Sequence, residues 1–138
     1  MEPSAPVPAP CPPRALRIVD SITELGPQDA GCIAVSGSHG GVSSARYAIA
    51  ARPWVSVFND AGVGKDAAGI AALALLQREN LAGCTVSHAS ARIGDARSTH
   101  DDGIISHANA LARALGLEPG LRWTEAMNRL SQPTGDPR

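Results

Sequence analysis

Three polar segments of this sequence follow apolar, strand-like runs, and they contain the residue types that acid–base chemistry and anion binding need. The first reads Ser-Gly-Ser-His-Gly-Gly over residues 36–41, the second is a glycine-rich run at 59–66, and the third spans 87–95. Because ligands of open α/β sheets bind outside the carboxyl ends of the strands, the sequence predicts one site between these three segments.

The first segment surrounds His39 with glycines. An imidazole titrates near neutral pH, so His39 is predicted to be the general acid or base, with the hydroxyl of Ser38 as a second catalytic candidate. Gly40 and Gly41 allow a close approach to the backbone, and their N–H groups are expected to stabilise a developing oxyanion. The alternative is a tight strand-to-helix turn that carries a surface histidine.

The second segment supplies a carboxylate, an amide and an amine. Asp60 is expected to orient His39 or to act as its partner base, and Asn59 is expected to assist the oxyanion. Lys65 is a candidate for binding an anionic substrate, but it is followed by Asp66 rather than by Ser or Thr. The GxxxxGK[ST] spacing of a phosphate-binding loop is therefore missing, which argues against a nucleoside triphosphatase. The alternative is that Asp60 forms an Asx-turn and Asp66 caps a helix.

The third segment adds His88 as a second acid–base candidate and Arg92 as a residue that binds a carboxylate or phosphate through two parallel hydrogen bonds. The alternative is a solvated loop in which Arg92 pairs with Asp95. No metal site and no cofactor is expected. The three cysteines lack metal-ligand spacing, and His100 with its two neighbouring aspartates is more typical of helix capping.

Strand-like and helix-like runs alternate along the chain. Strands are expected at 16–22, 32–35, 54–58 and 84–87, the last of them being the last clear strand. Helices are expected at 42–51, 66–78, 103–115 and 123–130, and a polar loop at 89–100. This alternation predicts an α/β fold, a three-layer sandwich around a small, mainly parallel sheet of about four to five strands.

Two of the expected helices depend on particular patterns. The helix at 66–78 carries Ile70, Leu73 and Ala74 on one face and is apolar almost all round, which predicts deep burial. The helix at 103–115 depends on apolar residues spaced i, i+4, i+7 and i+11, with Asp101 or Asp102 as its N-cap. Those apolar residues are Ile104, Ala108, Leu111 and Leu115.

Composition limits the domain organisation. More than half of the eleven prolines lie in the first 13 residues, so 1–14 is predicted to be a disordered proline-rich tail and 132–138 a second, flexible tail. Residues 15–131 are expected to form a single α/β domain. The exposed edges of so small a sheet favour a homo-oligomer or a subunit of a larger assembly.

Charge and hydropathy exclude several kinds of partner. The 138 residues have a net charge of −1 and only 3 % aromatic residues, so the basic stripe and stacking aromatics of a nucleic-acid-binding protein are missing. The longest apolar run, 67–76, is too short to cross a bilayer. The N-terminus lacks the pattern of a signal peptide, and the odd cysteine count favours reduced thiols in a cytoplasmic protein.

The order strand, Ser38-His39-Gly40, helix, strand and the small-residue run 59–64 resembles the caspase-like cysteine peptidases, including the bacterial CHAT type. In that family a strand ends in His-Gly, and a later strand ends in a small-residue run that contains the nucleophilic cysteine. Ala61 stands where that cysteine would be, so the resemblance implies the placement of the two loops but argues against peptidase activity. The chain also resembles small bacterial proteins that share GSHGG and FNDAG runs, with no implied activity.

These residues favour a small-molecule enzyme that acts on an anionic metabolite, by hydrolysis or by the proton transfer of a lyase or isomerase. No classical nucleophile can be named, since the sequence has no G-x-S-x-G motif. The alternative is a non-catalytic module or subunit that binds the same kind of anion at its helix N-termini.

Overall fold

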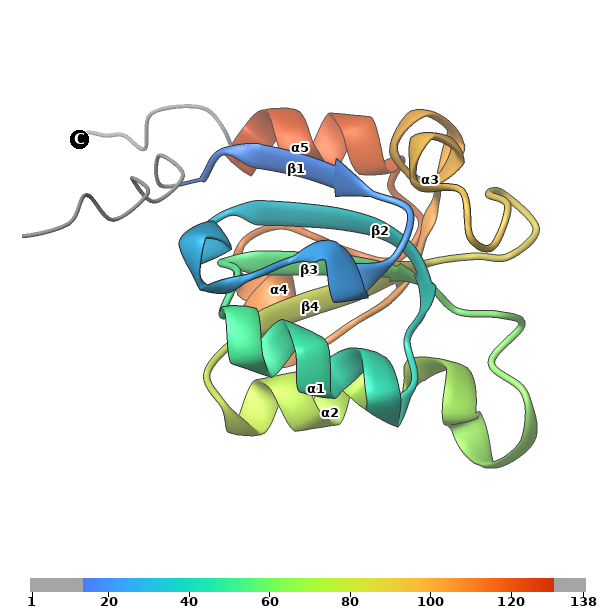
Figure 1. Cartoon of the computed structure of the whole chain (residues 1–138). Coiled ribbons are helices and arrows are strands. Elements are labelled where there is room, and N and C mark those ends of the chain that lie inside the picture. Colours follow the sequence, from blue (N-terminus) through green and yellow to red (C-terminus); the bar gives the residue numbers. More distant parts are fainter. Residues whose placement is uncertain (1–13, 131–138) are drawn as a thin grey trace, which may run out of the picture.

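A five-stranded sheet with helices on both faces forms the centre of this computed structural model, which describes residues 14–130 (Figure 1). The strand order is β1-β2-β3-β4-β5; the first four strands run parallel, and β5 is antiparallel to β4. This confirms the predicted α/β sandwich around a mainly parallel sheet. The strands are β1 (Leu16–Val19), β2 (Ile33–His39), β3 (Val55–Asn59), β4 (Ala82–Val86) and β5 (Ile105–Ala108). Except for Arg14, the predicted tails at 1–14 and 132–138 lie outside the described residues.

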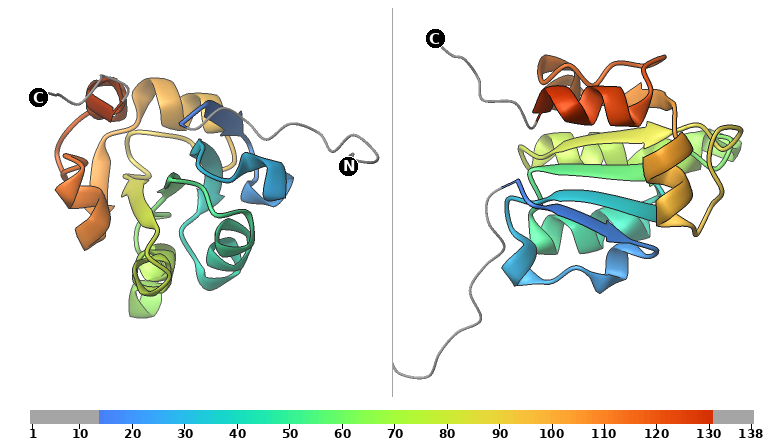
Figure 2. Two further views of the ribbon diagram at one scale, coloured as in Figure 1. Left: turned by 90° about the vertical axis from the view of Figure 1, so that its left-hand side faces the viewer. Right: turned by 90° about the horizontal axis from the view of Figure 1, so that it is seen from above.

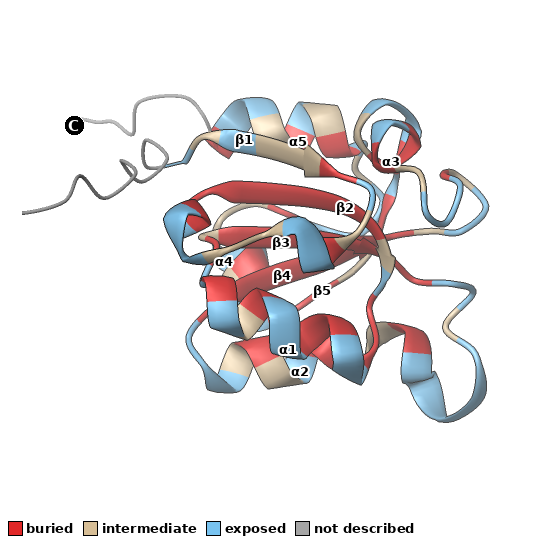
Figure 3. Ribbon diagram, in the orientation of Figure 1, coloured by how far each residue is buried: buried red, intermediate tan, exposed pale blue. Residues whose placement is uncertain are grey.

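Two helical layers cover the two faces of the sheet (Figure 2). One layer contains the 3₁₀ turns η1 (Ile22–Glu24) and η2 (Pro27–Asp29) and the helices α1 (Val42–Ala51) and α2 (Ala71–Arg78). The other contains α3 (Ala96–Asp102) and α5 (Trp123–Leu130), and α4 (Ala110–Ala114) packs beside β4. The central strands are buried on both faces, while the outer sides of the helices are exposed (Figure 3).

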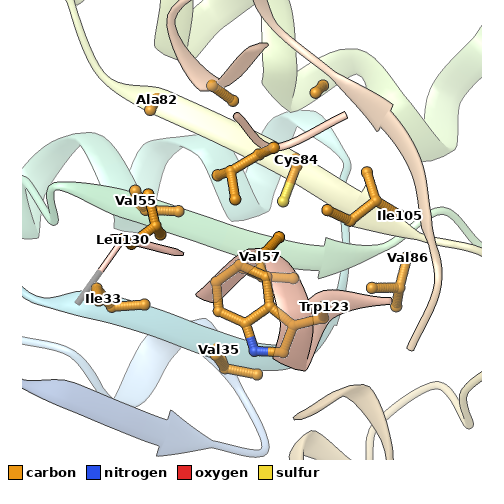
Figure 4. Close-up of a cluster of buried hydrophobic side chains, with 14 of the residues drawn as sticks. Ile33, Val35, Val55, Val57, Ala82, Cys84, Val86, Ile105, Trp123 and Leu130 are labelled. Carbon is orange, nitrogen blue, oxygen red and sulfur yellow. The ribbon is translucent and has the colours of Figure 1, made fainter. Parts of the chain in front are cut away.

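Each layer encloses its own apolar core. Under α1 and α2 the buried side chains are Ile22, Ala45, Ala48, Phe58, Ala72, Leu76 and Leu81. On the opposite face, Trp123 of α5 is fully buried against a sheet surface to which Val35, Val57 and Cys84 contribute (Figure 4). Because Trp123 and Phe58 are the two largest fully buried side chains, one aromatic residue supplies much of the volume of each core.

Two predicted helices coincide with observed ones. The helices expected at 42–51 and 123–130 are α1 and α5, with the expected bounds. α1 ends where Arg52, the residue before Pro53, takes the left-handed conformation with φ of 56°. A residue that precedes proline leaves the helical region, which accounts for this boundary.

The predicted helix at 103–115 is wrong, and so is the expectation that 84–87 is the last strand. Residues 105–108 form β5 instead, and Asn109 separates this strand from α4. The Asn109 side chain caps α4 by accepting a hydrogen bond from the Ala112 amide, and it donates to the carbonyl oxygens of Leu73 and Leu81. The apolar spacing therefore came from a strand joined to a short helix, and pairing with β4 outweighs local helix propensity.

The predicted loop at 89–100 is partly helical. α3 begins at Ala96 because the Asp95 carboxylate accepts a hydrogen bond from the Ser98 amide as an N-cap. Asp101 and Asp102, predicted to cap the next helix, instead form the end of α3.

The predicted helix at 66–78 is also interrupted. Residues 65–70 form the 3₁₀ segment η3, in which Asp66 and Ala67 have positive φ angles, and α2 begins only at Ala71. Ala74 is exposed, so α2 is buried on one side and not all round.

Strand boundaries also differ from the predictions. β1 ends at Val19, short of the expected 16–22, and β2 continues beyond 32–35 to His39. β3 is one residue later than expected, and β4 begins two residues earlier. The run that contains His39 is therefore mostly strand and not loop. Across residues 14–130, no helix has the length and apolar character needed to span a membrane.

A hydrogen bond between α3 and α5 predicts a pH dependence of stability. The Trp123 Nε1–H donates to His100 Nδ1 at 3.1 Å, which requires that nitrogen to be unprotonated. Burial lowers the pKa of His100; Asp101 opposes this shift and Arg97 adds to it. Because the unfolded chain takes up the proton first, the stabilisation is present above about pH 6.5 and is lost as the pH falls through the lower folded-state pKa.

We therefore expect the free energy of unfolding to fall between about pH 7 and 5, and to fall less in His100→Asn, whose amide oxygen replaces the Nδ1 acceptor. Urea unfolding across this range measures the effect, with the exposed His39→Asn as the matched control. An equal fall in the free energy of unfolding of wild type and His100→Asn would contradict this expectation.

Candidate functional site

The carboxyl ends of β3 and β4 lie side by side, and the segments that follow them leave toward opposite faces of the sheet (Figure 1). Residues 60–70 lead to α2 on one face, and residues 87–95 lead to α3 on the other. Where neighbouring connections diverge in this way, a crevice opens at the edge of an α/β sheet. The topology thus favours the β3–β4 boundary as the candidate site, one strand away from His39.

Asp60 is the buried charge at this boundary, with only 4 % of its surface exposed. Its Oδ1 atom accepts hydrogen bonds from the amides of Gly62, at 2.8 Å, and His88, at 3.0 Å. The same oxygen lies 3.6 Å from Nδ1 of the His88 ring, which is within ion-pair distance but too long for a hydrogen bond. Asp60 thus joins the segment after β3 to the segment after β4.

Opposing effects set the pKa of Asp60. Burial alone would raise it, but hydrogen bonds from the Gly62 amide, the Ser106 hydroxyl and the His88 amide, together with the charge of His88, bring it below the ordinary value. A buried carboxylate that receives several hydrogen bonds is stabilised in its charged form. Asp60 is therefore ionised at neutral pH.

Asp60→Asn tests this electrostatic balance through the acid stability of the protein. The asparagine oxygen can still accept both amide bonds, but it carries no charge. Because the pKa of Asp60 is lowered from 3.8, the unfolded state binds the proton first, and the stabilisation is lost as the pH falls through the lower folded-state pKa. Wild type should lose more free energy of unfolding than Asp60→Asn between about pH 5 and 3 in urea titrations. Equal decreases in the free energy of unfolding of the two proteins would contradict this expectation.

His88 is exposed, with 59 % of its side chain accessible. Its ring lies against Gly62, since a methyl group added there would meet Cε1 at 3.4 Å and Nδ1 at 3.5 Å. Nδ1 faces Asp60, which leaves Nε2 as the ring nitrogen available to a ligand. A carboxylate behind one nitrogen of an exposed imidazole orients the ring.

An open pocket of about 260 Å³ adjoins His88. Its lining residues are His88, Ala89, Ser90, Ala91, Arg92, Ser98 and Asp102, and we call it the β4–α3 pocket. Arg92 has 78 % of its side chain exposed and lies 3.7 Å from Asp95, the partner expected from the sequence. This is a weak surface ion pair, so the guanidinium remains accessible to an anion.

His39 lies at the end of β2 and is exposed. Its carbonyl oxygen accepts hydrogen bonds from the Gly41 amide and the Ser44 hydroxyl. Within residues 14–130, the hydrogen bonds and ion pairs include none between the His39 ring and Asp60, because Asp60 faces His88 instead. The structure therefore joins Asp60 to the second predicted histidine and not to the first.

Two other predicted site residues have structural partners. The Ser38 hydroxyl accepts a hydrogen bond from the Ile22 amide at 3.0 Å and so anchors η1. Asn59 is fully buried; its Nδ2 donates to the Ala91 carbonyl at 3.0 Å, and its Oδ1 accepts from the Ala61 amide at 2.8 Å. These contacts make Asn59 a second link between the segments after β3 and β4.

The glycine amides expected to stabilise an oxyanion are also engaged. The Gly40 N–H donates to the Asn59 carbonyl and the Gly41 N–H to the His39 carbonyl. Binding an oxyanion there would require both bonds to break. Lys65 is exposed in η3, and no side-chain partner for it occurs among the residues that the structure describes.

The segment after β3 is held in unusual backbone conformations. Ala61, Val63, Asp66 and Ala67 all have φ between 53° and 68°, which costs about 1–3 kcal/mol for a non-glycine residue. The Gly69 amide holds this segment by donating to the Val63 carbonyl. Such strain accumulates where a loop must place particular groups, here the Gly62 amide and the Asp60 carboxylate beside His88.

Three groups at the site escape prediction from sequence. Ser106 contacts Asp60 from β5, a strand hidden within a predicted helix. Ser98 and Asp102 line the pocket from α3, which occupies a predicted loop. The sequence does carry one signal for Ser106: the polar residues beside Ile105 lie in a run of strand length. Through residues 14–130, no three His, Cys, Asp or Glu side chains gather as metal ligands would.

The two runs that carry the resemblance to caspase-like peptidases end neighbouring strands, β2 and β3. That resemblance stays a prediction, because neighbouring loops alone do not define a family. Comparisons of this chain with protein-family models, with curated proteins and with solved structures found no match.

Proposed function

We propose that this protein is a small-molecule enzyme that transfers a proton to or from an anionic metabolite bound in the β4–α3 pocket. One observation carries the proposal: the buried, ionised Asp60 lies 3.6 Å behind Nδ1 of the exposed His88, which lines this pocket together with Arg92. A carboxylate, an accessible imidazole and a guanidinium at one strand edge are a set of groups suited to acid–base catalysis on an anion.

His88 is the proposed general acid–base residue. Asp60 keeps Nδ1 turned inward, so Nε2 takes a proton from the substrate and returns it later. A positioned general acid or base contributes about 10²–10⁴-fold to a rate. Asp60 is a positioning residue, since its contacts are with His88, Gly62 and Ser106.

Arg92 is the proposed anion-binding residue. Its planar guanidinium matches a carboxylate or phosphate through two parallel hydrogen bonds. The small side chains of Ala89 and Ala91 line the same pocket as Arg92 and His88.

The side chains near His88 favour proton transfer or water-mediated hydrolysis over covalent catalysis. The Ser90 hydroxyl donates to the Ser87 carbonyl and accepts from the Ser87 hydroxyl and the Ile104 amide, so it is already engaged. Burial in the core raises the pKa of Cys84 to about 12, which keeps its thiol protonated. The attacking group would thus be water, and the reactions of a lyase or isomerase need no nucleophile.

An assay by ¹H NMR in D₂O tests the proposal on a mixture of candidate substrates. The full chain is incubated with a pool of small carboxylates and phosphate esters, together with amides and esters of these acids. Loss of a C–H signal by exchange with solvent, or a new product signal, reports turnover. We expect wild type to convert at least one compound and His88→Gln to be slower by about 10²–10⁴-fold.

His39→Gln separates the two candidate histidines in the same assay. The proposal expects this variant to keep the wild-type rate, since the Asp60 carboxylate contacts His88. Turnover that survives His88→Gln but is lost in His39→Gln would refute the assignment and favour the site expected from the sequence.

A non-catalytic anion-binding module is the second candidate. The exposure of His88 and Arg92 at the surface favours it, because most active sites exclude water more fully. Saturable binding of a compound that wild type never converts would favour the module over the enzyme.

A further inference from the structure

The β4–α3 pocket contains two side chains of opposite charge. Arg92 belongs to the segment after β4, and Asp102 is the last residue of α3. Both line the same open space of about 260 Å³ together with His88. A ligand in this pocket would therefore meet a cation and an anion as well as the imidazole.

Ser98 connects the two charged residues. Its hydroxyl accepts a hydrogen bond from the Arg92 amide at 3.0 Å and donates to Asp102 Oδ2 at 3.4 Å. The second bond is long, so it satisfies the carboxylate only weakly. Ser98 itself is buried, which gives both charged residues a common, ordered support.

The two charges do not neutralise each other. The salt bridge of Arg92 is with Asp95, at 3.7 Å between two exposed side chains, and the ion pairs within residues 14–130 include none between Arg92 and Asp102. An exposed ion pair of this kind contributes about 0–1 kcal/mol, so a ligand can replace it at low cost. Arg92 and Asp102 therefore both keep the capacity to bind a charged group.

We infer that the pocket selects a small zwitterion, a molecule with an anionic group for Arg92 and an ammonium group for Asp102, as in an amino acid. This inference rests on the proposed function for the site itself. A simple anion such as phosphate would face the Asp102 carboxylate, and such like-charge placement works against binding. The volume of about 260 Å³ is below the roughly 300–1,000 Å³ of pockets for drug-sized ligands, which fits a metabolite of amino-acid size.

Titrations followed by ¹⁵N–¹H NMR of the full chain test this selectivity. The probes are a series of unbranched ω-amino acids from glycine to 6-aminohexanoate, which varies the distance between the two charges. Each is compared with the carboxylate and the amine of the same chain length. We expect at least one zwitterion to shift the amides of residues 88–92 and 98–102 saturably and to bind about tenfold more tightly than either matched compound.

Two pairs of variants assign the charges. Asp102→Asn should remove the tenfold preference over the matched carboxylate, whereas Asp101→Asn, with the same change one residue away and outside the pocket lining, should keep it. Arg92→Gln should abolish the shifts, and Arg97→Gln should not. Because each pair changes the net charge equally, a general electrostatic effect would appear in both members.

The outcomes separate this inference from the proposed function. If the matched carboxylate binds at the same amides as tightly as the zwitterion, the anion site stands and the zwitterion inference fails. The inference also fails if Asp102→Asn keeps the preference, or if no probe shifts these amides. The proposed function fails separately if His88→Gln retains wild-type turnover.

Discussion

Gly69→Ala is expected to lower the free energy of unfolding by about 3 kcal/mol, as over-packing against backbone atoms does. A methyl group at this position would overlap the Asp60 carbonyl oxygen and would come within 3.1 Å of the Val63 carbonyl oxygen. Neither obstacle is a flexible side chain, so the segment after β3 must move. Because that movement displaces the backbone of Asp60, we also expect the contact between Asp60 and His88 to be lost.

Gly26→Ala is the matched control for this variant. Its added methyl would meet only the end of the Gln28 side chain, and Gly26 has a φ of −137°, which alanine adopts readily. We expect the free energy of unfolding of Gly26→Ala to lie within about 0.5 kcal/mol of the wild-type value, as is typical of surface substitutions. Urea unfolding measures both variants, and the ¹⁵N–¹H spectrum shows whether the amides of residues 60–64 and 88 shift. Equal stabilities for the two variants would show that residues 60–69 are not packed as described.

Trp123→Ala is expected to destabilise the fold by about 4 kcal/mol, within the range for large aromatic residues removed from a core. Trp123 is fully buried against the sheet, where it contacts the cluster that contains Val35, Val57 and Cys84 (Figure 4). The substitution also removes the Nε1–H bond to His100. Since domains of this size are stable by about 5–15 kcal/mol, the variant should remain folded only marginally.

Trp123→Phe separates packing from hydrogen bonding. Phenylalanine keeps most of the buried ring but loses the N–H donor. We therefore expect the free energy of unfolding to fall by only about 1–2 kcal/mol, the usual effect of removing one partner of a hydrogen bond and leaving a small cavity. Urea unfolding at neutral pH measures both variants. A loss of less than about 1 kcal/mol for Trp123→Ala would contradict the burial of this side chain.

Local patterns predicted the parts of the fold that local forces determine. The helix expected at 42–51 ends at the Arg52-Pro53 boundary, and the helix expected at 123–130 has its predicted bounds. The sheet itself was predictable from the alternation of apolar runs. Long-range pairing decided the rest: residues 105–108 are a strand because they pair with β4, although their spacing matches a helix.

The sequence was enough to identify the individual residues of the candidate site, but not which of them contact one another. Asp60, His88 and Arg92 are each identifiable from the sequence, because each follows a strand and has a reactive side chain. The pairing of Asp60 with His88 and not with His39 depends on two loops that leave toward opposite faces. The spacing of residues along the chain does not show toward which face of the sheet each loop leaves. Asp102 joins the pocket only because α3 folds back over the sheet, a contact between distant segments.

The tautomer of His88 shows whether Asp60 holds this ring as the acid–base group. Long-range ¹H–¹⁵N NMR of the imidazole rings distinguishes a neutral ring protonated at Nδ1 from one protonated at Nε2. We predict that neutral His88 carries its proton on Nδ1, which faces the Asp60 carboxylate, and that Asp60→Asn weakens this preference. The tautomer of His39 should be the same in both proteins. A neutral His88 ring protonated at Nε2 in the wild type, or an unchanged tautomer ratio in Asp60→Asn, would contradict this role of Asp60.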